Sequence, residues 1–444
     1  MSSGKTEKVW KEAIVEAPEQ GGVLDQIMAT MPETVERSQV EKLVQNLIEQ
    51  CTDGMVAYDA SLYNSLEQGV RKLDEALSKQ LAEIMHDPRV QQMEGTWRGL
   101  HHVVFSSETC SSLKLKVMDV TKEELLRDFD RAVEFDMSAT FKRIYTEEFG
   151  QAGGEPYAAL IGDYEFTNHS QDIKLLRYMS SVAAAAFAPF VSAASPKMFG
   201  LDSYTDLNRI RALESCFQGD DYIKWREFRK HPDSRFVVLT LPRVLTRLPY
   251  GETTLPIQDF AFEEFKRNEK GEHIVADHDH YCWMNCAYPF GARLSEAFAK
   301  TNWCTRIVGY DSGGRVEDLP SHVVTTEEGD RQQKCPTEVL IPDRRDAEIS
   351  ALGFLALVNW KRTDHATFLT CSSVHKPTVY PTDNDKTADG KLGSQLPYVM
   401  ATSRIAHFTK AMGRELLGKQ KELPEVQKYF TEWISQFVYN DPTP

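Results

Sequence analysis

The sequence predicts a mixed α/β fold, in which helices cover a sheet, preceded by an N-terminal helical arm. Short apolar runs at residues 158–161, 236–241 and 354–358 are typical of buried strands. Helix-start signals lie between such runs, for example the capping-box pair Thr121 and Glu124. The chain is 41% hydrophobic and 26% charged, an ordinary globular composition. Strands that alternate with helices indicate a mixed or parallel sheet with helices on its faces.

The N-terminal arm is predicted from helical spacing of apolar residues. Ser38 and Glu41 form a capping box that begins a helix ending near Cys51. Apolar residues then recur with an eleven-residue period from Leu62 to Ile84, which places them in a nearly straight stripe on a long helix. The segment 55–58 between the two helices reads as an extended strand.

The apolar stripes have two interpretations. The helices pack on their own domain, or they pack against helices of another chain. We favour the second, because the stripes lie outside the α/β core. The predicted partner-binding residues are Val40, Leu43, Leu47, Met55, Val56, Tyr58, Leu62, Leu66, Val70, Leu73, Leu77 and Leu81.

Three regions follow: a helical arm at 1–85, a central α/β domain at 86–376 and a C-terminal region at 377–444. Near the start of the central domain, residues 113–117 alternate Leu or Val with Lys, which predicts a half-buried strand. Residues 381–394 read as a polar, turn-rich linker. A helix over 395–417 follows. A second helix from Pro424 is expected to bury Val426, Phe430, Trp433, Ile434, Phe437 and Val438.

Charge and apolar content exclude several classes of protein. The 51 Lys and Arg against 66 Asp and Glu give a net charge of −15, so no nucleic-acid partner is expected. The longest apolar stretch, 182–191, is interrupted by Pro189 and is too short to span a bilayer, which takes about 20 residues. The N-terminus has no signal-peptide core. We expect a cytoplasmic protein with reduced thiols and no direct membrane insertion.

Two sets of residues could carry chemistry, and each has a structural alternative. Asp163 and Glu165 follow a predicted buried strand, where α/β enzymes often place catalytic carboxylates. No nucleophile or metal triad accompanies them, so a structural role is favoured. The residue types in His278, His280, Cys282 and Cys286 ligate zinc. Their spacing fits neither a zinc knuckle nor a standard finger. We expect no cofactor and no enzyme activity.

Long motifs spread over residues 25–440 resemble one known family, the TssC/VipB/EvpB large sheath subunits of type VI secretion systems. The most specific are MEGTWRGLHHVV at 93–104, VTKEELLRDF at 120–129, GGEPYAALIGDYEF at 153–166 and APFVSAASPKMFG at 188–200. Further matches are residues 222–251, CPTEVLIPDRRDAEISALGF at 335–354, SSVHKP at 372–377 and QLPYVMATSRIAHF at 395–408.

The resemblance implies a fold like that of contractile phage-tail sheaths, without catalytic residues or a cofactor. It implies a heterodimer with the small sheath subunit (TssB/VipA type), self-assembly into a tube around the Hcp inner tube, nucleation on a baseplate and disassembly by a ClpV-type AAA+ ATPase. Family members usually continue into terminal strands that interlock neighbouring subunits. The sequence ends at Pro444, and the resemblance implies that it lacks them.

Overall fold

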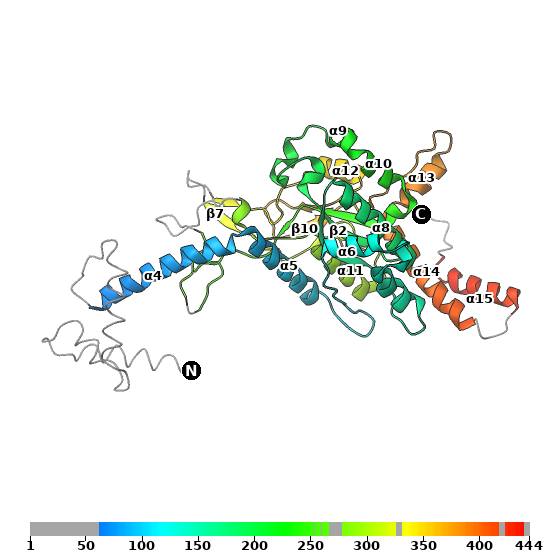
Figure 1. Ribbon diagram of the computed structural model, residues 1–444, viewed down its shortest axis with the longest axis horizontal. Helices are drawn as coiled ribbons and strands as arrows, with labels where there is room; N and C mark the ends of the chain where they lie inside the picture. Colours follow the sequence, from blue (N-terminus) through cyan, green and yellow to red (C-terminus); the bar gives the residue numbers. More distant parts are fainter. Residues whose placement is uncertain are drawn as a thin grey trace. The chain divides into compact units, whose positions relative to one another are not determined.

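The computed structural model describes residues 62–252, 254–258, 260–265, 278–325, 331–416 and 422–438. These residues form two compact units. The smaller unit holds helix α4 (Leu62–Met85) and a loop segment over residues 249–265. In that segment the backbone N–H of Tyr250 donates to the Glu264 carboxylate at 2.8 Å. The larger unit contains the sheet and the other helices (Figure 1).

The main sheet of the larger unit is mixed, as the sequence predicts. Its strand order is β1-β2-β3-β9-β10-β6, and the first four strands are parallel. Strand β10 is antiparallel to both of its neighbours. The strands are β1 (Leu160–Phe166), β2 (Phe190–Ala194), β3 (Val237–Leu241), β9 (Leu355–Asn359), β10 (Ala366–Phe368) and β6 (Arg315–Val316). The three apolar runs therefore form strands, although the first begins two residues later than predicted and is longer.

Both faces of the central strands are buried. Successive side chains of a strand point to opposite faces, and neighbouring residues such as Val238 and Leu239 accordingly pack into two different hydrophobic clusters. One cluster lies against helices α8 (Ser170–Ala186), α10 (Ile223–Lys230) and α12 (Asp343–Ala351). The other lies against α11 (Ala287–Thr301) and the start of α14 (Leu396–Leu416). This three-layer arrangement explains why these strands are continuously apolar.

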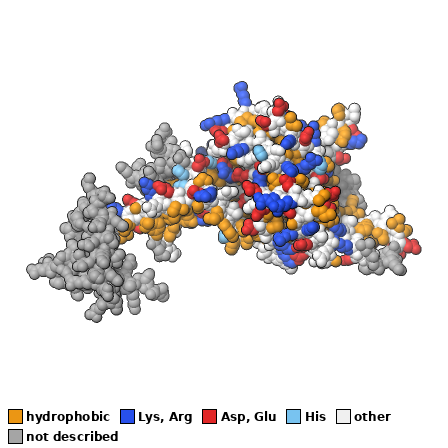
Figure 2. Space-filling model, viewed as in Figure 1, with side chains coloured by type: hydrophobic (Ala, Val, Ile, Leu, Met, Phe, Trp, Pro, Cys, Tyr) orange, Lys and Arg blue, Asp and Glu red, His pale blue; other side chains and the backbone are white. Residues whose placement is uncertain are grey.

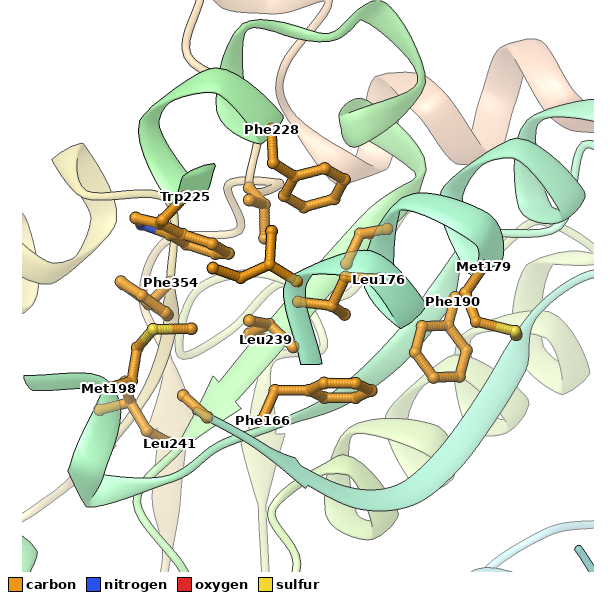
Figure 3. Packing of buried hydrophobic residues seen from close by; sticks show 14 of the residues in the cluster. Phe166, Leu176, Met179, Phe190, Met198, Trp225, Phe228, Leu239, Leu241 and Phe354 are labelled. Atoms are coloured by element: carbon orange, nitrogen blue, oxygen red, sulfur yellow. The ribbon is translucent and has the colours of Figure 1, made fainter. Parts of the chain in front are cut away.

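The first cluster contains Trp225 and Tyr204, the two largest fully buried side chains among the described residues. Trp225 stacks on Phe354 with ring centroids 5.6 Å apart and an interplanar angle of 17°, and both are fully buried. Figure 3 shows them beside Leu239 and Leu241 of β3, with Phe166 and Phe190 from β1 and β2 completing the packing. Contacts of this kind, made by aromatic rings from separate elements, are the main source of stability in such a core.

The remaining elements are shorter or lie at the margins of the sheet. The helices are α5 (Pro88–Phe105), α6 (Lys122–Arg131), α7 (Ala139–Phe141), α9 (Leu213–Cys216), α13 (Asn384–Leu392) and α15 (Leu423–Ser435). The short strands form two pairs, β4 (Val244–Leu245) with β5 (Trp283–Met284) and β7 (Val323–Thr325) with β8 (Arg331–Gln333). A π-helix, η2, spans Lys142–Gly150. The 3₁₀ helices are η1 (Phe135–Met137), η3 (Pro196–Phe199), η4 (Tyr204–Arg209), η5 (Asp220–Tyr222), η6 (Pro232–Phe236) and η7 (His278–His280).

The predicted capping box is confirmed. The Thr121 backbone N–H donates to the Glu124 carboxylate at 2.9 Å, and the Glu124 N–H donates to the Thr121 hydroxyl at 3.2 Å. Helix α6 begins at the next residue, Lys122. The pair satisfies two backbone donors that the first turn leaves open, and a cap of this kind contributes about 1 kcal/mol.

Three predictions for the larger unit are wrong. Residues 113–117 form no strand, and Val117 is 70% exposed. The predicted linker at 381–394 contains helix α13, because the Asp383 side chain caps it by accepting from the Lys386 N–H. In the helix predicted from Pro424, α15, none of the residues expected in the core is buried. These are Val426, Phe430, Trp433, Ile434, Phe437 and Val438; Phe437 is 47% and Val438 55% exposed.

The described residues contain no helix that is both long and apolar enough to cross a membrane. Every cysteine among them is a free thiol. The domain boundaries at 85/86 and 376/377 stay predictions.

Candidate interaction surfaces

Helix α4 carries the predicted apolar stripe, and much of it is exposed. Leu66, Val70, Leu77 and Ile84 are 41%, 54%, 52% and 60% exposed. Leu73 and Leu81 are partly buried. Figure 2 shows hydrophobic side chains gathered along the lower side of α4. Four large apolar side chains exposed in helical register, instead of singly, are typical of a surface that another helix covers.

Part of the predicted partner-binding set cannot be placed. Leu62 begins α4, and only its backbone is described. Six further residues of the set lie outside the described residues: Val40, Leu43, Leu47, Met55, Val56 and Tyr58. The helix predicted over 38–51 and the strand predicted over 55–58 lie there as well. Their assignment to an interface stays a prediction.

Helix α5 of the larger unit presents a second apolar face that the sequence analysis did not single out. Met93, Trp97 and Val104 follow one another at near-helical spacing and are 58%, 66% and 41% exposed. Phe105 at the helix end is 76% exposed, and His101 stacks on its ring at 4.1 Å. The sequence does carry a sign of this face, namely the near-helical spacing of Met93, Trp97 and Val104 within the motif at 93–104.

The opposite face of α5 is fixed by two glycines. A Cβ on Gly95 would lie 2.4 Å from the Trp283 carbonyl oxygen, and a Cβ on Gly99 would lie 2.2 Å from the Tyr288 ring. Only glycine permits this approach, so α5 packs directly on β5 and α11. The packing leaves a groove of ≈ 710 Å³ beside the exposed face. Its lining includes Trp97, His101, Phe105, Met284 and Leu319.

Asp163 and Glu165 lie within strand β1, not after it as predicted, and both are near the sheet margin. Asp163 accepts a hydrogen bond from the Thr96 hydroxyl of α5 at 2.5 Å. Burial, and then the neighbouring Asp163, raise the pKa of Tyr288. The Glu165 side chain reaches solvent, yet the surrounding protein atoms remove enough water from its carboxyl to raise the pKa. The contacts of Asp163 tie β1 to α5 and α11.

A buried ion pair lies beside Glu165. Arg243, which follows β3, donates to Glu338 through Nε and Nη2, each at 2.8 Å. His278 Nε2 lies 3.2 Å from the same carboxylate, whose side chain has no exposed surface. Burial would raise the pKa of Glu338, but the hydrogen bonds from Arg243 and His278 outweigh burial and lower the pKa to about 2. The pair fastens the chain after β3 to the segment before α12, which is a structural task.

The structure contradicts the zinc alternative, because the four side chains do not converge. His278 contacts Glu338 and Lys334, and His280 stacks on His86 at 4.5 Å. Burial raises the pKa of the Cys282 thiol to about 11 and raises that of Cys286 further. Buried thiols of this kind behave as small hydrophobic groups. Within the described ranges, no three His, Cys, Asp or Glu side chains are grouped to hold a metal ion.

Comparison with known proteins identifies the family. Residues 67–375 match the family model described as EvpB/VC_A0108, tail sheath N-terminal domain. Residues 385–444 match EvpB/VC_A0108, tail sheath gpW/gp25-like domain. The chain belongs to this tail-sheath family. It is also 41% identical over 409 residues to the type VI secretion system sheath protein TssC1 of Pseudomonas aeruginosa PAO1, a match that covers 91% of this chain and 80% of that protein.

Family membership gives the exposed surfaces their meaning. The chain is the structural large subunit of a type VI secretion contractile sheath, and its phage-sheath-like fold follows from the two matched domains. A sheath subunit works by assembling with other chains. Stripes of exposed apolar residues on α4 and α5 are therefore surfaces that assembly can cover, whereas the Asp163 carboxylate of β1 holds the sheet to its helices.

Proposed function

We propose that the stripe on α4 binds the small sheath subunit of the TssB/VipA type, and that the resulting heterodimers polymerise into a sheath. The exposure of Leu66, Val70, Leu77 and Ile84 on one 24-residue helix supports this. Covering half-exposed side chains of this size contributes on the order of 1 kcal/mol each. A helix with a similar apolar stripe is the natural complement, because side chains then interdigitate along both axes.

We extend the proposal to the residues that the structure does not describe. The helix predicted over 38–51 would add Val40, Leu43 and Leu47 to the same interface. The strand predicted over 55–58 would join a sheet shared with a neighbouring subunit, since backbone hydrogen bonds join chains with little demand on side chains. Deletion of residues 55–58 without loss of sheath assembly would contradict the second part.

The assembled sheath would enclose an Hcp inner tube, start on a baseplate and be taken apart by a ClpV-type AAA+ ATPase. Assembly would take place in the cytoplasm. Contraction needs no nucleotide in this scheme, because an extended sheath held in a metastable packing releases stored conformational free energy when its subunits repack. The polypeptide itself makes and breaks no covalent bonds in this work.

The test is co-purification with the small subunit from one expression host. Leu73→Asp with Leu77→Asp places two charges in the stripe, and we expect co-purification to be lost. The matched control is Gln68→Asp with Lys79→Asp, which puts two aspartates, eleven residues apart, on the exposed polar face of the same helix. The control should bind like the unchanged chain. Undiminished binding by a folded Leu73/Leu77 variant, checked by circular dichroism, would reject α4 as the binding helix.

A further inference from the structure

A pocket of ≈ 360 Å³ lies in the larger unit beside helix α13. Its lining comes from three parts of the chain: Arg235 of η6, the segment 375–380 and one face of α13. The N–H of Tyr380 donates to the Thr387 hydroxyl of α13 at 2.9 Å, which holds the helix against the segment. Ligand pockets measure roughly 300–1,000 Å³, so this one has the size for a small molecule.

One wall of the pocket carries positive charge that no carboxylate balances. Arg235 Nε donates to the Pro232 carbonyl at 2.9 Å, and no Asp or Glu of the described chain forms an ion pair with its guanidinium. Arg229, only 8% exposed, donates to the carbonyls of Val374 and Ala351 at 2.9 and 3.2 Å and likewise meets no carboxylate among the described residues. Guanidinium groups without a counter-ion favour an anion beside them.

His375 lies on the same wall and stays neutral. Burial, and then the charge of Arg235, lower the pKa of the His375 imidazole, and Arg229 acts in the same direction. Its Nδ1 lies 3.1 Å from the His231 carbonyl oxygen, which can only accept a hydrogen bond. Nδ1 therefore carries the ring proton, and Nε2 is left as an acceptor for a hydroxyl of a bound molecule.

The face of α13 that lines the pocket adds a carboxylate. Lys386, Asp389, Gly390 and Gly393 line it at helical spacing. Lys386 Nζ lies 3.1 Å from Asp383, whereas Asp389 forms no ion pair with any described residue. Asp389 is placed along the helix between Lys386 and Gly393. The pocket thus offers cationic donors together with one carboxylate acceptor.

The two glycines of this face keep the pocket open. A glycine within a helix costs about 1 kcal/mol relative to alanine. A Cβ on Gly390 would lie 3.6 Å from the Thr378 carbonyl oxygen, and a Cβ on Gly393 would lie 3.9 Å from Arg235 Nη1. These are ordinary contact distances, and Gly393 has a φ of −65°, so neither packing nor backbone conformation demands glycine. The missing side chains leave space for a ligand.

We propose that this pocket binds a small phosphate monoester that carries hydroxyl groups, such as a sugar phosphate. The Nη groups of Arg235 donate to two phosphate oxygens, a geometry that suits a planar guanidinium. Asp389 accepts from the hydroxyl groups, which a bare anion lacks. The Tyr380 ring, a residue 44% exposed, covers the apolar face of the sugar.

Isothermal titration calorimetry on the full chain tests the proposal. The probes are glucose 6-phosphate, glycerol 3-phosphate, inorganic phosphate and unphosphorylated glucose. At least one ester should bind saturably with a Kd below about 1 mM. Inorganic phosphate should bind at least tenfold more weakly than that ester, and glucose should not bind.

Three substitutions locate the binding. Arg235→Gln should weaken binding of the ester at least tenfold, and Arg235→Lys, which keeps the charge but loses the fork, should also weaken it. Asp389→Asn should weaken binding of the ester tenfold without weakening that of inorganic phosphate. Gly390→Ala should weaken binding of the ester while slightly raising the free energy of unfolding, a combination that a merely structural role does not give. The matched control is Arg209→Gln, an arginine side chain 84% exposed in the same unit, which should change neither quantity.

Each contrary outcome overturns a stated part of the proposal. Absence of saturable binding by both esters up to about 10 mM overturns the site. Equal affinity for esters and inorganic phosphate, unchanged by Asp389→Asn, means an adventitious ion only and overturns the sugar-phosphate class. Ester binding that folded Arg235→Gln and Arg235→Lys variants retain in full, with folding checked by circular dichroism, overturns its placement in this pocket.

Discussion

The sheet core and helix α4 contain the same kinds of apolar residue but differ in how far these are exposed to solvent. Phe354 and Leu239 of the core have no exposed surface, and Trp225 retains 1%. Val70 and Leu77 of α4 expose about half of their side chains. Both regions show regular apolar spacing in the sequence, so spacing alone does not say what covers a stripe. The core is completed by its own chain, whereas α4 keeps a face that matches the needs of an assembling subunit.

The largest expected effect lies on the core side of this comparison. Trp225→Ala should lower the free energy of unfolding by about 3–5 kcal/mol, because it removes a fully buried ring and leaves a cavity against Phe354. Ile223→Ala on the same helix is the control, since Ile223 is 46% exposed. It should cost less than about 1 kcal/mol. Urea unfolding of the isolated chain measures both, and equal losses would show that α10 is not sorted into buried and exposed faces.

A smaller, pH-dependent effect probes the polar part of the same core. The folded-state pKa of Glu338 is about 2, below its ordinary value of 4.5, so the ionised form is favoured in the folded protein. The ionised Glu338 carboxylate therefore adds to the free energy of unfolding. This stabilisation is fully present above pH 4.5 and is lost as the pH falls from 4.5 towards 2. The size is about 3 kcal/mol at 1.36 kcal/mol per pKa unit.

The substitution that isolates this contribution is Glu338→Gln. The decrease in the free energy of unfolding that this substitution causes, measured with urea, should be largest at pH 7 and should become steadily smaller below pH 4.5. Arg243→Gln removes the other partner and serves as the comparison. Without Arg243 the pKa of the buried Glu338 carboxyl should rise, so that it becomes protonated at a higher pH. A cost for Glu338→Gln that is the same at pH 7 and pH 3 would contradict the ion pair as its source.

The smallest effect on stability is expected on α4. Val70→Ser and Leu77→Ser should each change the free energy of unfolding of the isolated chain by no more than about 0.5 kcal/mol, because both side chains are half exposed. The pair should nevertheless weaken binding of the small subunit tenfold or more. Urea unfolding and a binding titration measure the two quantities on one preparation. Destabilisation above about 2 kcal/mol would mean that α4 is completed by its own chain after all.

Much of the central fold could be predicted because local and global signals agree there. Residues 237–241 are apolar on both faces of a parallel strand, and Thr121 with Glu124 marks a helix start that needs no tertiary contact. The long α4 stripe was equally readable from its eleven-residue period. What the period leaves open is whether the stripe faces its own domain or another chain.

The wrong predictions concern segments whose structure depends on contacts with distant residues or on a single capping residue, which composition and spacing do not reveal. Alternation at 113–117 identifies which residues would share a face of a strand, but no strand of the described chain pairs with this segment, and its lysines pair with Glu148 and Glu155 instead. Residues 381–394 are rich in turn formers, yet the Asp383 cap is enough to begin α13. The zinc alternative is wrong although the four residues are close in sequence. His278 and His280 lie in η7 and contact Glu338 and His86, whereas Cys282, before β5, and Cys286, before α11, are buried thiols.

The glycine contacts of α5 have a mechanical consequence. At Gly95 and Gly99 the helix backbone lies directly against the Trp283 carbonyl and the Tyr288 ring, with no side chain of α5 in between. Close-packed interiors are barely compressible and transmit strain. A load applied to the outer side of α5 therefore reaches α11 and the central sheet almost without slack. The helix therefore moves with α11 and the sheet as one rigid part, and a bulkier residue at either glycine would push α5 away from the elements that it contacts.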